Sequence, residues 1–61
     1  MYKIETIYQD GQFNLTRTHE WMRAVQYFCN CLEDSTVAEC KIFDSQDTPI
    51  LSYTKPKEIH S

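Results

Sequence analysis

The chain is short of the residues on which most enzymatic sites depend. Its 61 residues include one glycine and two histidines, so it has no glycine-rich phosphate-binding loop and few candidates for a general base. Nucleophilic catalysis needs a positioned base and an oxyanion hole, and so short a chain leaves little room for the usual pocket of roughly 300 Å³ or more. We therefore predict that the protein is not an enzyme and needs no cofactor.

Long apolar runs are also missing. No stretch approaches the ~20 apolar residues of a membrane span, and the first residues, MYKIETIY, alternate in polarity instead of forming a charged start and an apolar run. We expect no signal peptide. Three cysteines cannot all pair within one chain, and an odd number without an export signal favours reduced thiols. These features predict an intracellular, cytoplasmic protein with no membrane partner.

Basic residues are in the minority, with six against nine acidic ones and a net charge of −3. This balance gives no electrostatic reason to expect binding to nucleic acid or to an anionic membrane. Aromatic side chains on an open sheet can nevertheless stack on bases. A nucleic-acid-associated regulator therefore remains an alternative, with Tyr2, Tyr8, Phe43 and Tyr53 as its candidate rings.

The cysteines lack the spacing of a metal site. Cys29 and Cys31 are two residues apart, about 200° around a helix, so they should flank its apolar face on opposite sides. There is no CxxC pair, whereas a structural zinc site needs four well-spaced ligands. We predict no metal ligands and small buried or half-buried thiols, including Cys40. A thiol or metal-binding protein is the third alternative.

One segment, 18–33, is predicted to be a helix. Its apolar residues recur at helical spacing and share one face: Trp21, Ala24, Val25, Phe28 and Leu32. Thr18 is the expected N-cap, which places Glu20 in the first turn, where the helix dipole favours negative charge.

The rest of the chain alternates in polarity as strands do, over residues 2–8, 12–17, 37–43 and 50–54. Asp10-Gly11 is a preferred tight hairpin turn, and residues 44–49 are rich in turn formers. The predicted fold is α+β, a small, mostly antiparallel ββαββ sheet with one helix across one face and the two hairpins side by side. A βαββ order, with 12–17 as a loop, is the alternative. We expect residues 1–54 to form a single domain and residues 55–61 to form a polar C-terminal tail.

The expected core joins the helix face to one side of the sheet. The strand residues expected to point inward are Ile4, Phe13, Leu15, Cys40, Ile42 and Leu51.

Two surfaces remain for a partner. The sheet face away from the helix should carry Lys3, Glu5, Ile7, Glu39, Lys41 and Phe43, together with Val37. The flanks and back of the helix should carry Met22, Arg23 and Tyr27. Mixed apolar and charged faces and strand edges are common protein-binding surfaces. We therefore expect a small non-enzymatic protein-binding module that contacts a larger protein or itself, such as an adaptor, an inhibitor, a regulator, or a viral or mobile-element accessory protein.

Overall fold

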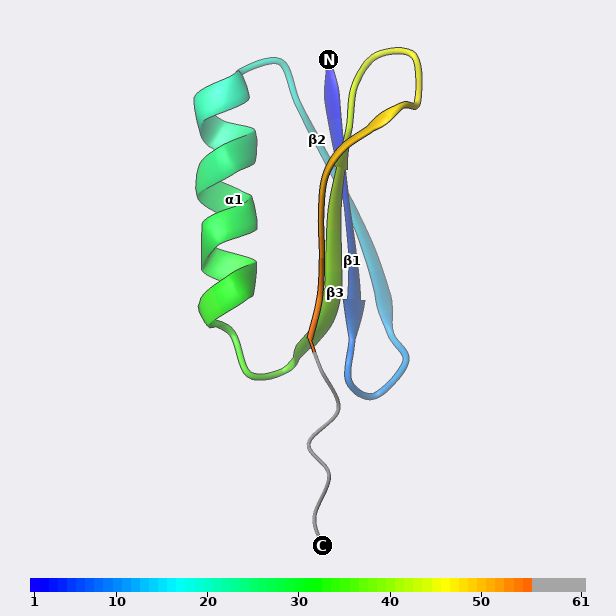
Figure 1. The fold of residues 1–61 in the computed structure, drawn as a ribbon, viewed down its shortest axis with the longest axis vertical. Coiled ribbons are helices and arrows are strands. Elements are labelled where there is room, and N and C mark those ends of the chain that lie inside the picture. Colours follow the sequence, from blue (N-terminus) through cyan, green and yellow to red (C-terminus); the bar gives the residue numbers. More distant parts are fainter. Residues whose placement is uncertain (56–61) are drawn as a thin grey trace, which may run out of the picture.

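The computed structural model describes residues 1–55 and has the element order ββαββ. The elements are β1 (Tyr2–Tyr8), β2 (Phe13–Thr18), α1 (Trp21–Glu33), β3 (Val37–Phe43) and β4 (Pro49–Thr54). All neighbouring strands are antiparallel in the order β2-β1-β3-β4, and α1 lies along one side of the sheet (Figure 1). The predicted α+β fold with its hairpins side by side is confirmed, and the βαββ alternative is wrong. Apart from Lys55, the predicted tail lies outside the described residues.

The first hairpin turns through three residues. The amide of Gly11 donates to the carbonyl of Tyr8 at 2.9 Å, and the amide of Tyr8 donates to the carbonyl of Gln12 at 2.8 Å. Gly11 has φ +90°, so the loop is a type I turn followed by a left-handed bulge residue. This loop pairs Phe13 with Ile7, whereas a two-residue loop at Asp10-Gly11 would pair it with Tyr8.

That register reverses the expected orientation of β2. Partners across an antiparallel ladder share a face, so Phe13 and Leu15 lie on the face of Ile7 and Glu5, away from the helix. The prediction that Phe13 and Leu15 point into the core is therefore wrong. A shift of one residue moves every side chain of a strand to the other face.

The helix begins later than predicted. β2 continues to Thr18, and Glu20 occupies the N-cap position without a side-chain cap. The hydroxyl of Thr18 accepts from the amide of Glu20 at 3.2 Å, so it closes the turn before α1 instead of capping the helix. The prediction of Thr18 as N-cap and Glu20 as a first-turn residue is wrong. The predicted end at Glu33 is confirmed.

The buried stripe of α1 is displaced around the helix axis. Its buried residues are Ala24, Phe28 and Cys31, and Tyr27 packs at their margin, which amounts to a rotation of roughly 60° from the expected face. Trp21 is consequently 39% exposed and covers Tyr2, with 5.2 Å between ring centroids. Cys31, expected at the flank, is a core residue.

A bulge changes the start of β3. Tyr8 pairs with Val37 and Ile7 with Glu39, so Ala38 is the extra residue between them. Val37 therefore turns toward the helix and is 1% exposed. Strict alternation predicts Val37 on the opposite face, and this prediction is wrong because of the bulge.

The core lies between α1 and the two central strands. It comprises Ile4, Ala24, Phe28, Cys31, Val37, Cys40 and Ile42. Leu51 pairs with Ile42 on the helix side as expected, but it is 37% exposed because α1 packs mainly over β1 and β3. Among residues 1–55, no helix has the length and apolar character needed to span a bilayer.

Candidate functional site

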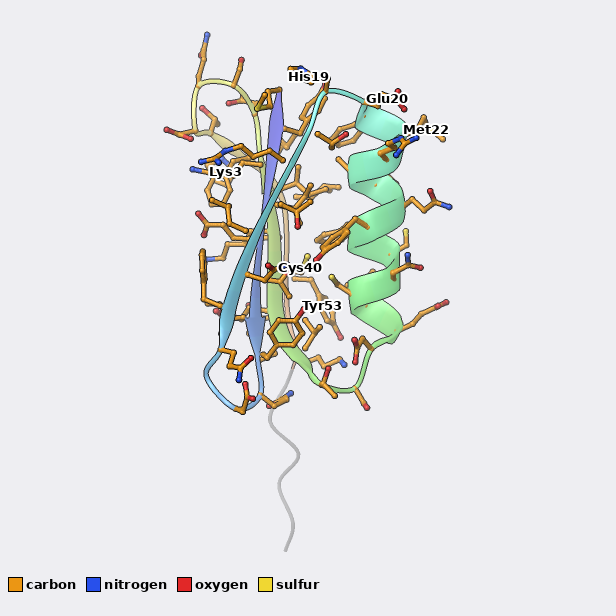
Figure 2. All side chains as sticks on the ribbon, turned by 180° about the vertical axis from the view of Figure 1, so that it is seen from behind. Lys3, His19, Glu20, Met22, Cys40 and Tyr53 are labelled. Carbon is orange, nitrogen blue, oxygen red and sulfur yellow. The ribbon has the colours of Figure 1, made fainter. Side chains whose placement is uncertain are left out.

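The side of the sheet that α1 leaves bare is the main candidate surface. We call it the uncovered sheet face. The ladder register and the alternation of side chains place on it Lys3, Glu5, Ile7, Phe13, Leu15, Arg17, Glu39, Lys41, Phe43, Ser52 and Thr54. The structure thus brings together all six sheet residues predicted for this surface and removes Val37 from it. Figure 2 shows Lys3 on this side, opposite the helix.

Apolar side chains gather at the hairpin end of this face. Phe13 is 58% exposed and lies opposite the half-buried Ile7, and Leu15 follows on the same strand at 37% exposure. Phe13 and Leu15 are absent from the predicted surface because their apolar character assigned them to the core. The signal that could have found them is the length of the first hairpin loop, since the register follows from it.

Charged side chains occupy the middle of the face. The ammonium of Lys3 lies 2.8 Å from a carboxylate oxygen of Asp47 and 3.9 Å from one of Glu5, and 5.1 Å from the ring centroid of Phe43. The hydrogen bond from Lys3 and its positive charge lower the pKa of Asp47. Lys41 lies opposite Glu5 in the ladder. Apolar and paired charged groups therefore alternate over the surface.

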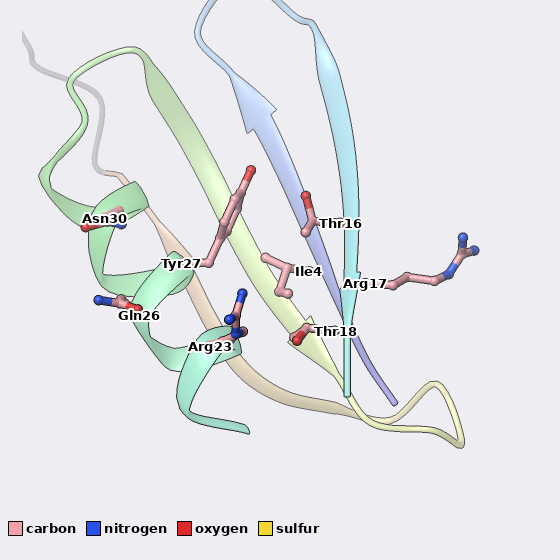
Figure 3. A pocket seen from close by; sticks show the side chains of 8 residues that line it. All are labelled: Ile4, Thr16, Arg17, Thr18, Arg23, Gln26, Tyr27 and Asn30. Carbon is pink, nitrogen blue, oxygen red and sulfur yellow. The ribbon is translucent and has the colours of Figure 1, made fainter. Parts of the chain in front are cut away.

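A groove runs between α1 and β2. It has a volume of about 300 Å³ and is lined by Ile4, Thr16, Arg17, Thr18, Arg23, Gln26, Tyr27 and Asn30 (Figure 3). Of its lining residues, all but Ile4 carry a polar or charged group in the side chain. The hydroxyl of Tyr27 accepts from the side-chain amide of Asn14 at 2.9 Å, and Arg23 lies 3.1 Å from the carboxylate of Glu20.

The three helix residues predicted as a second patch do not form one surface. Arg23 and Tyr27 line the groove, whereas Met22 is 75% exposed and projects from the helix away from the sheet (Figure 2). Met22 therefore lies apart from both the groove and the uncovered sheet face.

The thiols are distributed between the surface and the core. Cys29 is exposed, whereas Cys31 and Cys40 are buried. The buried hydroxyl of Thr6 lies 3.8 Å from the sulfur of Cys31, which serves as its hydrogen-bond partner. Burial, reinforced by the neighbouring Cys31, raises the pKa of Cys40 to about 12. Within residues 1–55 no three His, Cys, Asp or Glu side chains cluster as a metal site would require.

The raised pKa of Cys40 predicts a loss of stability at alkaline pH. The ordinary thiol value is 9.0 and the folded value about 12, so the unfolded thiol ionises first as the pH rises. The stabilising effect is complete below about pH 9 and is lost progressively up to about pH 12. Urea unfolding at pH 8 and pH 10.5 should show the decrease. Cys40→Ala should be less stable at pH 8 but should lose less stability between the two pH values; an equal loss in both proteins would contradict the assignment.

Comparison with known proteins identifies no relative: no family model, curated protein sequence or solved structure matches the chain. The function of the protein must therefore be inferred from its own surface. That surface consists of the uncovered sheet face, the exposed edge of β2 beside it and the polar groove behind that edge.

Proposed function

We propose that the protein is a small non-enzymatic binding module that acts inside the cell by surface contact with another protein. The observation that supports this most strongly is the uncovered sheet face, where Ile7, Phe13, Leu15 and Phe43 are accessible among charged residues. Accessible apolar groups interspersed with charged ones are typical of protein-binding surfaces. An adaptor, an inhibitor or a regulator would use such a face.

The charges on this face favour protein over nucleic acid. Lys3 is held by Asp47 and Glu5, and Lys41 lies opposite Glu5. Glu39 accepts a hydrogen bond from Thr54 at 3.3 Å. Phosphate binding needs an excess of basic groups along one surface, whereas here each sign is interspersed with the other. Interspersed charges with apolar groups suit a protein partner of complementary pattern.

Replacing Phe43 by threonine or Lys41 by glutamate should weaken capture of the partner by about tenfold or more. Phe43→Thr removes accessible ring area while keeping a strand-forming residue, and Lys41→Glu places a like charge opposite Glu5 and reverses the charge shown to the partner. The measurement is an affinity pull-down from the native cell, quantified by mass spectrometry against the unaltered protein.

Met22→Thr is the matched control, because Met22 is exposed but lies off the sheet face. It should capture the partner at the unaltered level, and far-UV circular dichroism should show all three variants folded. Equal capture by the Phe43, Lys41 and Met22 variants would refute the uncovered sheet face as the binding surface. A captured partner released by nuclease, or lost steeply between about 50 and 200 mM salt, would favour the nucleic-acid alternative.

A further inference from the structure

The two edges of the sheet are protected unequally. β4 starts with Pro49 and carries a bulge opposite the end of β3, and both features discourage a further strand. β2 pairs with β1 on one side only. Its six residues contain no proline, its ladder has no bulge, and it is a regular strand throughout. The β2 edge is therefore able to accept another strand.

The residues whose backbone groups face outward from the β2 edge follow from the first hairpin. The amide of Tyr8 donates to the carbonyl of Gln12, and hydrogen-bonded pairs alternate along an antiparallel ladder. Asn14, Thr16 and Thr18 are therefore bonded to β1. The amides and carbonyls of the intervening residues point away from the sheet, and these residues are Phe13, Leu15 and Arg17.

We propose that two copies of this chain join through their β2 edges, antiparallel, about a two-fold axis at Leu15. The two four-stranded sheets then form one continuous sheet. This inference rests on the proposed function and extends it, because it names a second copy of the chain as a partner at the strand edge beside the uncovered sheet face. It identifies the β2 edge as the contact between the copies.

The register at Leu15 uses the outward groups most completely. Leu15 meets Leu15 of the second copy, and Phe13 meets Arg17 of the second copy on each side of the axis. These three pairs supply about six inter-strand hydrogen bonds, two for each pair. An axis at Asn14 or Thr16 pairs only two sets of outward groups and leaves about four bonds. The edge therefore has one preferred self-complementary register.

The side chains match in the same register. Arg17 points away from the helix (Figure 3) and has no salt bridge within the part of the chain that the structure describes. In the pair its guanidinium approaches the exposed ring of Phe13, a favourable cation–π contact, and the two leucines meet at the axis. On the helix side, Asn14 meets Thr16 of the second copy beside the polar groove. On both faces of the sheet, the side chains of β2 in one copy therefore complement those of β2 in the second copy.

A charge swap tests the register. Phe13→Lys places an ammonium opposite each Arg17 of the other copy and should weaken the dimer by about tenfold or more. Phe13→Lys combined with Arg17→Glu creates two opposite-charge pairs and should restore most of the association. Residues 13 and 17 are four apart on one strand, roughly 13 Å, so recovery cannot arise within one chain. Sedimentation velocity over a concentration series measures the fraction of dimer. The contact involves one short strand from each copy and lies at the small end of interface sizes, so we expect micromolar or weaker affinity.

Two controls make the result specific. Thr54→Lys alters the β4 edge and should leave dimerisation unchanged. Leu15→Cys in a Cys29→Ser background should form an intermolecular disulfide on oxidation, because hydrogen-bonded partners have Cα atoms about 5.5 Å apart.

A monomer at every concentration, or a dimer whose affinity is unchanged by Phe13→Lys, would overturn the proposal. If the chain is monomeric but partner capture still depends on Phe43, the dimer is wrong and the proposed function stands. If the charge swap controls dimerisation but the Phe43→Thr variant captures the partner normally, the dimer stands and the uncovered sheet face is not the binding surface.

Discussion

Phe28→Ala should leave much of the protein unfolded at 25 °C. Phe28 is the largest side chain that α1 buries, at 8% exposure, and it packs in the core with Ile4, Val37 and Ile42. Truncating a buried phenylalanine costs about 3–5 kcal/mol. The whole free energy of unfolding of a 61-residue domain is roughly 3–9 kcal/mol. Urea unfolding followed by circular dichroism at 222 nm should show a midpoint near zero denaturant.

Trp21→Ala provides the matched comparison on the same helix. Trp21 is larger than Phe28 but 39% exposed, and its ring packs at a tilt against the ring of Tyr2. We expect it to cost about 1–2 kcal/mol, from the lost aromatic contact and partial burial. If Trp21→Ala destabilised the fold more than Phe28→Ala, the helix would be rotated toward the face that the sequence pattern indicated.

The class of fold was predictable because its signals are local. Alternating polarity marks strands and a 3.6-residue period marks a helix, and four short strand patterns around one helix leave few arrangements. Asp10-Gly11 and the run 44–49 each contain a turn. In the second run the carboxylate of Asp44 accepts from the amides of Gln46 and Thr48, at 2.8 and 2.9 Å. Such turns depend only on neighbouring residues.

The orientations of β2 and of the start of β3 were not predictable in the same way. In β2 every second residue is apolar or basic and the others are small and polar, so alternation alone does not identify the buried side. The length of the hairpin loop decides which side is buried. A two-residue loop pairs Phe13 with Tyr8, whereas the observed three-residue loop pairs it with Ile7 and so turns it to the other face. The helix-facing side of β2 is instead polar, with Asn14 bonded to Tyr27. An edge strand tolerates this because α1 covers it only partly.

The candidate surface was predictable where charge decides the orientation. Lys3, Glu5, Glu39 and Lys41 cannot be buried unpaired, so their strands had to turn these residues away from the helix. Phe13 and Leu15 carry no such constraint, and apolar character assigned them wrongly to the core. A hydrophobic residue can serve either a core or an interface. Only the register shows that these two are exposed beside an open strand edge.

Val37→Asp should unfold the protein, whereas Ala38→Asp should leave it folded. Val37 is 1% exposed and packs in the core, while Ala38 is half-buried at the bulge. Burying an unpaired carboxylate costs several kcal/mol, comparable with the total stability, whereas Asp at position 38 keeps access to water and should cost about 1 kcal/mol. Circular dichroism and urea unfolding of both variants measure the difference. Regular alternation of β3 requires the opposite order, with position 38 inward, so a stable Val37→Asp and an unfolded Ala38→Asp would refute the bulge.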